Sequence, residues 1–290
     1  MNVPVATGDL MDRASLAAAM RGCEAVIHAA GYYPTKATSH DAHLQMARAM
    51  IGNVLSAMRD ASVPRLVYTS SISTIGPIPG NRLGTEADYY WPGQRSAPYW
   101  DCKWAQEEAV LAAADLHTTA LIPSAILGPG DVKPTTGTIV LAVARAPSWI
   151  TIDGRVNVVD VREVAQAHVA ALTSGGPGER YLIGGHNLTI SELHRLIAHA
   201  VGRRAPLVAI PSWLVGPIGD LALRGAQALH VPGAVSLAYI WQAMSARQWI
   251  DSARAQRALG YRPRPIEETI RDTVQWFRER GYFERPLRAL

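Results

Sequence analysis

The chain has 290 residues, of which 48% are hydrophobic and 18% charged, and its net charge at pH 7 is +4. These values are typical of an ordinary soluble core of one large or two modest domains. The basic residues are scattered and there are only two cysteines, so the sequence argues against nucleic-acid binding, a disulfide framework and a zinc set. Neither a signal peptide nor a membrane span is predicted, and we expect a cytoplasmic protein.

Short apolar runs alternate with helical patterns through the first two thirds of the chain. Strands are predicted at 3–7, 25–29, 65–70, 118–123, 149–152, 155–159 and 180–184, with helices at 12–21, 39–61 and 99–115. Such alternation is typical of a parallel sheet covered by helices. A capping box at 189–192 predicts a helix to about residue 201, and further helices are predicted near 212–229, 235–247, 252–259 and 266–280.

The predicted strand 65–70 runs directly into hydroxyl side chains. Thr69, Ser70 and Ser71 follow the apolar run, and Gly76 and Pro77 then break the pattern. Hydroxyls at the carboxyl end of a buried parallel strand lie where open α/β sheets bind their ligands. A serine there can hydrogen-bond a substrate carbonyl oxygen as negative charge develops on it, although serine and threonine also begin ordinary turns.

A tyrosine and a lysine stand four residues apart in the helix predicted at 99–115. The chain carries 28 lysines plus arginines, but only Lys36, Lys103 and Lys133 are lysines. Residues four apart share one face of a helix, so the Lys103 ammonium would lie near the Tyr99 phenol and stabilise its phenolate. A tyrosine tuned in this way can exchange a proton with a substrate oxygen. An amphipathic helix with an exposed lysine explains the pair equally well.

Together, the strand, the serines and Tyr-x-x-x-Lys resemble the extended short-chain dehydrogenase/reductase family. The resemblance extends along nearly the whole chain, and further segments that carry it are 8–16, 26–31, 123–130 and 251–263. Segments 128–135 and 178–185 resemble a narrower branch, the dihydroflavonol reductase-like proteins, which include the hopanoid-associated sugar epimerase-like ones.

The resemblance implies a Rossmann-like core over 1–187, with 131–150 contributing to the substrate side, and a smaller, mostly helical substrate lobe over 188–290. It implies a catalytic triad in which Tyr99 donates the proton, Lys103 tunes it and contacts the cofactor ribose, and Ser71 binds the carbonyl oxygen. The cofactor, NADP or NAD, would contact Asp9, Leu10, Ala29, Ala30, Gly31, Thr69, Tyr99, Lys103, Pro123 and Ile126. Candidate substrate contacts are Tyr33, Ser73, Trp91 and Trp100. Aromatic side chains around a cleft suit an apolar or ring-bearing substrate, although loop packing explains them nearly as well.

The resemblance is incomplete at the start of the chain. The family opens with a strand and a Gly-x-x-Gly-x-x-Gly turn, whose following helix binds the pyrophosphate, whereas this chain begins in what resembles the third strand. We therefore expect the first βαβ unit to be missing, and segment 3–7 either to pair with 25–29 or to stay at a loosely held edge. Segment 216–222 repeats the glycine spacing, but Asp220 within it would face any phosphate and argues against a dinucleotide site.

Three functions remain open from the sequence. The first is an oxidoreductase that transfers a hydride between a nicotinamide cofactor and a carbonyl or secondary alcohol of a small organic substrate. The second is an NAD-dependent sugar or sugar-nucleotide epimerase, which uses the same triad for a transient oxidation. The third is a non-catalytic remnant that cannot bind the dinucleotide. Ala47 stands where the family has an asparagine of its proton relay, and this replacement argues for the third possibility. The resemblance also implies a homodimer through helices 39–61 and 99–115, and no metal site is predicted.

Overall fold

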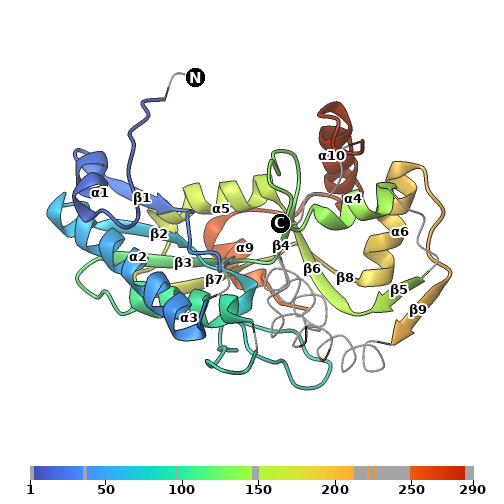
Figure 1. Cartoon of the computed structure of the whole chain (residues 1–290), viewed down its shortest axis with the longest axis horizontal. Coiled ribbons are helices and arrows are strands. Elements are labelled where there is room, and N and C mark those ends of the chain that lie inside the picture. The colour runs from blue at the N-terminus through green and yellow to red at the C-terminus, as the bar shows by residue number, and fades with distance from the viewer. Residues whose placement is uncertain are drawn as a thin grey trace.

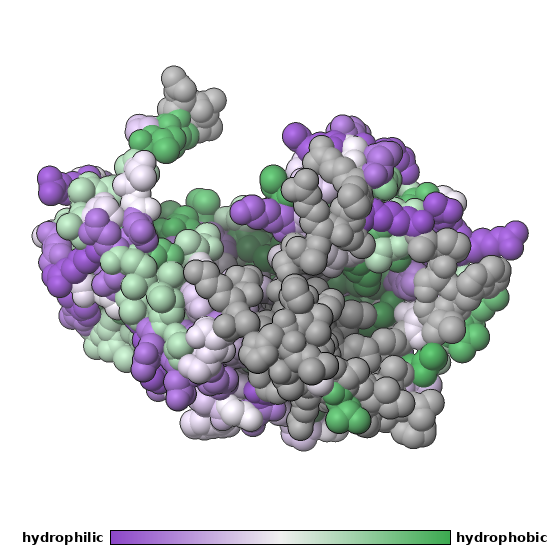
Figure 2. Space-filling model, viewed as in Figure 1, coloured by the Kyte–Doolittle hydropathy of each residue, from purple (hydrophilic) through white to green (hydrophobic). Residues whose placement is uncertain are grey.

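A computed structural model describes residues 3–34, 38–95, 97–145, 150–211 and 249–284, together with Leu221 and Gly225. Two packed regions lie side by side along the long axis of the molecule, one built on a four-stranded sheet and the other on two smaller sheets (Figure 1). In Figure 2, hydrophilic side chains gather on the visible face over α1 and α2 at one end of the molecule and over α10 at the top. None of the described helices is long and apolar enough to cross a membrane.

The first region contains a four-stranded parallel sheet. Its order is β1 (Ala25–His28), β2 (Arg65–Thr69), β3 (His117–Pro123) and β7 (Glu179–Ile183). Ala25 pairs with Arg65, and Arg65 pairs with His117, so the carboxyl ends of these strands reach one edge of the sheet. Leu66 and Val67 in β2 are both fully buried, as expected for a parallel strand covered on both faces.

Helices cover both faces of this sheet. On one face, α1 (Arg13–Met20), α2 (His40–Asp60) and α3 (Pro98–Leu111) share a core with Leu66 and Tyr68. On the other face, α5 (Val161–Ser174) and α9 (Ala253–Leu259) pack on Val67 and neighbouring strand residues. Alternate residues of β2 therefore enter different cores, which is the period of two expected of a strand.

The second region contains the shorter strands. β4 (Ala125–Leu127) pairs in parallel with β6 (Arg155–Asp160), and β8 (His186–Thr189) adds to β6 antiparallel. A separate parallel pair joins β5 (Ile150–Asp153) to β9 (Val208–Pro211). The helices α4 (Thr138–Arg145), α6 (Ile190–Val201) and α10 (Ile266–Glu279) share an apolar core with these strands. The capping box predicted at 189–192 begins α6, which ends at Gly202, a residue in the left-handed conformation.

One predicted strand is wrong, and several elements were not predicted. Segment 3–7 forms no strand, and the side chains of Val3 and Val5 are 67% and 94% exposed, so it does not pair with β1. Pro4 lacks a backbone N–H for such pairing. The helices α4 and α5 and the strands β4, β8 and β9 were not among the predicted elements. The predicted helices 212–229 and 235–247, and segment 216–222, lie outside the described residues apart from Leu221 and Gly225.

Candidate active site

Helix α3 carries the tyrosine and the lysine on one buried face. Pro98 occupies its first turn, where a missing N–H costs no hydrogen bond, and the helix runs without a break to Leu111. Tyr99 is 8% exposed and Lys103 is 9% exposed, so the interpretation of Lys103 as an exposed lysine is wrong. Glu107 continues the same face one turn later and is also buried. An ammonium is rarely buried without a specific partner, so the burial of Lys103 indicates a specific role, whereas a lysine that only made the helix soluble would be exposed.

The Lys103 ammonium lies at the ends of two neighbouring strands. Its Nζ donates to the carbonyl oxygen of Thr69 at 3.2 Å, and it lies 5.5 Å from the centre of the Tyr68 ring. A Cβ atom added to Gly31 would stand 3.1 Å from Nζ, so the chain after β1 passes close to it. Burial lowers the pKa of Lys103 to about 8, against the opposing effect of Glu107, which raises it.

Ser71 lies where β2 gives way to the short helix η1 (Ile72–Thr74). Its backbone is extended, and its Oγ accepts a hydrogen bond from the Ser73 backbone N–H at 3.2 Å. This bond uses the oxygen as an acceptor and leaves the hydroxyl proton to be donated elsewhere. Ser73 is 1% exposed, and its Oγ has no hydrogen-bond partner. Because η1 packs against α3, the two serines lie on the same side of the sheet edge as the Tyr99 helix.

A buried charged network supports the segment from Ser70 to Thr74, which we call the serine loop, and the sequence did not predict this network. Glu107 accepts hydrogen bonds from Ser70 Oγ and from Thr74 Oγ1, the latter at 2.8 Å. The Arg180 Nε lies 2.7 Å from the other Glu107 carboxylate oxygen, and Arg180 Nη2 donates to the Thr74 carbonyl oxygen at 3.1 Å. Both side chains of this ion pair are 4% exposed. The repeat of the Tyr99–Lys103 spacing at Glu107 could have indicated its position, whereas Arg180 comes from β7, and nothing local indicates that contact.

The predicted cofactor contacts fall into two groups. Ala29, Ala30 and Gly31 follow β1, Thr69 ends β2, and Pro123 ends β3, so these residues lie at the carboxyl ends of adjacent parallel strands, with Ile126 just beyond in β4. Asp9 and Leu10 instead lie on the segment before α1. There, Asp9 Oδ1 accepts from the Met11 N–H and the Leu10 carbonyl accepts from Asn53, both at 2.9 Å.

The strand-end group fits the ribose and nicotinamide half of a dinucleotide. Lys103 already lies against Gly31 and Thr69 there, and the buried His28 Nε2 at the end of β1 has no hydrogen-bond partner within the part of the chain that the structure describes. The described residues contain no glycine-rich turn that opens a helix beside these strands, and the N-terminus of α1 is occupied by the Asp12 side chain. The described residues therefore fit the ribose end of a dinucleotide, through Lys103, and not its pyrophosphate.

The four candidate substrate residues occupy different environments. The Tyr33 ring lies 5.0 Å from the Tyr99 ring and is 36% exposed, so this contact brings an aromatic side chain next to the catalytic candidate. Burial raises the pKa of Tyr33 well above its usual value, so its hydroxyl stays protonated. Trp91 is 65% exposed, whereas Trp100 is 2% exposed and packs against Tyr90. Packing of the loop, rather than contact with a substrate, thus accounts for Trp100.

Two histidines of α2 have partners among neighbouring side chains. His40 Nε2 lies 2.8 Å from an Asp101 carboxylate oxygen, and His43 Nδ1 lies 2.6 Å from the Tyr32 hydroxyl. Asp101, buried inside Tyr-x-x-x-Lys, also accepts from the Tyr90 hydroxyl and from the Gly93 N–H. Asp101 therefore ties the loop before α3 to the helix that carries Tyr99 and Lys103.

We predict that His28 makes the protein sensitive to acid. Burial, with a smaller contribution from the Lys103 charge, lowers the pKa of His28 to about 4, and its ring stacks on Tyr68. Because the unfolded state binds the proton more readily between pH 6.5 and 4, stability falls as the pH decreases through this window. Between pH 7 and pH 5 the expected loss is about 2 kcal/mol. Urea unfolding of wild type and His28→Asn at both pH values tests this, and an equal acid loss in both proteins would contradict it.

The sheet, its helices and the buried Tyr–Lys pair define a class: a Rossmann-like protein of the extended short-chain dehydrogenase/reductase type. Comparison with known proteins agrees. Residues 1–178 match the model of the 3-beta hydroxysteroid dehydrogenase/isomerase family, and the chain belongs to that family. This confirms the family and the α/β fold inferred from the sequence motifs, and the family uses NAD or NADP.

Relatives cover most of the chain. A putative dihydroflavonol 4-reductase of Synechocystis is 29% identical over 97% of this chain and 84% of its own. The 2-alkyl-3-oxoalkanoate reductase of Stenotrophomonas maltophilia is 30% identical over 93% and 86% of the two chains. The crystal structure of a nucleoside-diphosphate-sugar epimerase from Pseudomonas aeruginosa superimposes with a TM-score of 0.78 at 28% identity, covering 96% and 83%. Members of the family are thus reductases, dehydrogenases and epimerases, which supports hydride transfer as its shared chemistry.

Proposed function

We propose that this protein transfers a hydride between a nicotinamide cofactor and a carbonyl or secondary alcohol of an apolar, ring-bearing substrate. The observation that carries the proposal is the burial of Tyr99 and Lys103 on one face of α3, with the Lys103 ammonium at the end of β2. A buried cation beside a phenol favours transfer of the phenol proton. The resemblance also supports a homodimer that forms through α2 and α3.

Each residue of the site has a distinct role in this proposal. The cofactor, when bound, supplies or accepts the hydride. Lys103 would hold its ribose, beside the backbone of Gly31 and Thr69 that the Lys103 ammonium already approaches. Tyr99 moves a proton at its phenolic oxygen to or from the substrate oxygen, and Ser71 donates its free hydroxyl proton to that same oxygen. Buried walls exclude water and strengthen these interactions.

The surroundings of Tyr99 support an apolar substrate. The partly exposed Tyr33 ring lies against Tyr99, and a ring-bearing substrate would stack on it. The names of the relatives point the same way, since a dihydroflavonol and a 2-alkyl-3-oxoalkanoate both combine a carbonyl with apolar groups. We therefore place the substrate carbonyl at Tyr99 and its apolar body toward Tyr33.

Replacement of Tyr99 by phenylalanine tests the reaction directly. It removes the proton donor but keeps the ring, and kcat is expected to fall by about 10²–10⁴-fold. The assay follows NADPH and NADH oxidation with a dihydroflavonol and with a 2-alkyl-3-oxoalkanoate. Tyr89→Phe is the matched control, because Tyr89 stacks on Arg180 outside the triad and its hydroxyl has no part in the proposal. Full activity in Tyr99→Phe would contradict the role of Tyr99.

Cofactor binding separates this proposal from the two alternatives. Quenching of the fluorescence of the eight tryptophans by NADPH measures binding without turnover. Wild type and Tyr99→Phe are expected to bind alike, because phenylalanine leaves Lys103 in place. Absence of quenching would favour a protein that holds no dinucleotide. Interconversion of UDP-glucose and UDP-galactose with no net cofactor consumption would favour an epimerase.

A further inference from the structure

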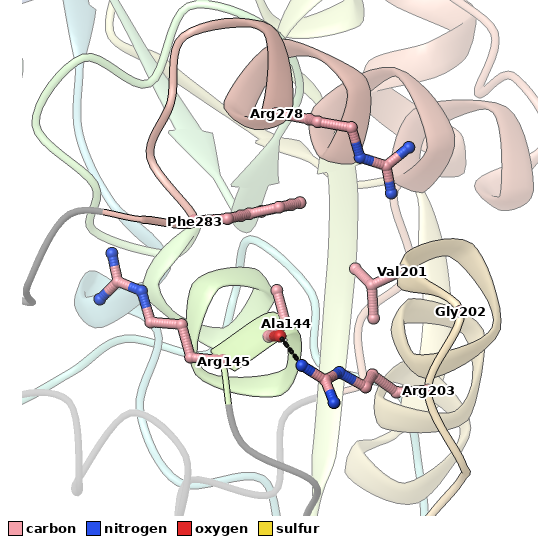
Figure 3. A pocket seen from close by; sticks show the side chains of 7 residues that line it. All are labelled: Ala144, Arg145, Val201, Gly202, Arg203, Arg278 and Phe283. Atoms are coloured by element: carbon pink, nitrogen blue, oxygen red, sulfur yellow. Dashed lines mark hydrogen bonds between the residues drawn. The ribbon is translucent and has the colours of Figure 1, made fainter.

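A hollow lies in the second region of the molecule, away from the triad. It is open to the surface, has a volume of about 480 Å³ and lies where α4, α6 and α10 all end (Figure 3). Its lining consists of Ala144, Arg145, Val201, Gly202, Arg203, Arg278 and Phe283. None of these residues takes part in the proposed hydride transfer.

The lining is strongly positive. Three of its seven residues are arginines and none is acidic. Within the described part of the chain, none of the three forms an ion pair with a carboxylate. Their contacts are with neutral groups: Arg145 donates to the Tyr282 carbonyl at 2.5 Å, and Arg203 donates to the Ala144 carbonyl at 3.1 Å. The Arg278 guanidinium lies 5.8 Å from the Phe283 ring centre.

Helix capping explains only part of this arrangement. Basic side chains near a helix C-terminus interact favourably with its carbonyls, and all three arginines stand at such ends. Each helix end offers only about half a negative charge, whereas each arginine carries a full positive one. An excess of positive charge therefore remains at the hollow. In addition, Arg145 Nε and Nη1 are shielded from solvent and have no hydrogen-bond partner among the described residues, which is costly for a guanidinium.

The shape of the hollow indicates what it could bind. In Figure 3, Arg203 and Arg278 lie on two sides of the hollow, the Phe283 ring lies beside it, and the Arg145 guanidinium points away from the other two arginines. A guanidinium has five N–H donors in a planar fork, so Arg203 keeps donors beyond the one bound to Ala144. Two such forks suit a phosphate or carboxylate group, while Phe283 and Val201 suit an attached ring.

We propose that this hollow binds a small organic anion, a phosphate or carboxylate attached to a ring. Arg203 and Arg278 hold the anionic group, and the ring lies against Phe283 and Val201. Binding weakens as salt rises, because the partners of the anion are exposed charges. The site is separate from the triad, so an anion bound in the hollow would not block the candidate active site around Lys103.

Isothermal titration with phenyl phosphate tests this site, with inorganic phosphate and phenol as partial probes. Arg203→Gln and Arg278→Gln are each expected to weaken phenyl phosphate binding about tenfold or more, because each removes charge-assisted hydrogen bonds. Arg271→Gln is the matched control: it removes the same charge from α10, but Arg271 does not line the hollow. Lys103→Met is expected to bind like wild type, which separates this site from the triad.

The outcomes are distinguishable. The proposal is supported if inorganic phosphate and phenol both bind more weakly than phenyl phosphate, and if only Arg203→Gln and Arg278→Gln weaken the binding of phenyl phosphate. Equal weakening in Arg271→Gln, or loss of binding in Lys103→Met, would overturn it. So would the absence of binding at millimolar phenyl phosphate. Thermal unfolding of each variant without ligand checks that the exposed arginines were replaced without loss of the fold.

Discussion

Replacing Glu107 with alanine is expected to lower the free energy of unfolding by about 3–5 kcal/mol. The Glu107 carboxylate is buried against Arg180, so its removal leaves a guanidinium in the core without its counter-charge. The Ser70 hydroxyl loses its acceptor as well. Chemical denaturation of wild type and Glu107→Ala measures the loss, and a change below about 1 kcal/mol would show that the pair behaves like a surface ion pair.

Two control variants establish the cause of this loss. Asp115 pairs with Arg59 across the surface, and both side chains are about half exposed, so Asp115→Ala is expected to change stability by less than about 1 kcal/mol. Replacing both buried partners, as in Glu107→Leu with Arg180→Met, removes both charges together. Such double replacements are often neutral or stabilising, so this variant is expected to recover much of the stability. It is also expected to lose activity, because the hydrogen bonds from Ser70 and Thr74 to α3 are then lost.

The network explains how the fold positions the candidate site. Glu107 binds Ser70 and Thr74 on either side of Ser71, and it stands one helical turn beyond Lys103. One carboxylate therefore fixes the serine loop relative to the helix that carries the tyrosine and lysine. Arg180 anchors that carboxylate to β7 and also donates to the Glu86 carbonyl oxygen at 2.7 Å. The order of the site thus depends on a contact between residues distant in the sequence.

Much of the fold was predictable because its signals are local. The strands of the main sheet are short apolar runs, and α3 begins at a proline that suits its first turn. The serines and the Tyr-x-x-x-Lys spacing are local as well. The segment 3–7 was predicted wrongly because its valines suggest a strand but cannot show whether a partner is available. The strand β8 was not predicted because Leu188 is the one apolar residue among its four, and β9 was not predicted because it ends at Pro211, a residue more typical of turns and strand edges.

The rest of the site depends on burial, which the spacing cannot show. The same Tyr-x-x-x-Lys pattern suits an exposed lysine or a buried one, and only the packing of α3 decides between them. Burial also decides among the aromatic residues, since Tyr33 faces Tyr99 while Trp100 packs into the core. Similarly, the three arginines of the hollow in the second region are each separated from the next by more than fifty residues in sequence, and only the fold brings their helix ends together.

Replacing Lys103 with methionine is expected to lower kcat/KM by about 10²–10⁴-fold, because the Tyr99 phenol loses the cation that stabilises its phenolate. In the wild type, kcat/KM is expected to fall above pH 8. This quantity reports the ionisation of the free enzyme, in which the pKa of Lys103 is about 8. The variant is expected to lack that decline. Initial rates from pH 6 to 10 at limiting substrate give both profiles, and an unchanged decline in Lys103→Met would assign it to another group.

Stability shows whether this loss of activity comes from misfolding. Burial lowers the pKa of Lys103 in the folded state, so the unfolded state binds more protons between about pH 8 and 10.5. Folding therefore works against the Lys103 charge at neutral pH, by about 3 kcal/mol, and this penalty is relieved as the pH rises through that window. Methionine carries no such penalty, and Lys103→Met is expected to be at least as stable as wild type at pH 7. Lys103→Arg keeps the charge, but its larger fork must fit where Nζ already approaches Gly31, so low activity is expected there too.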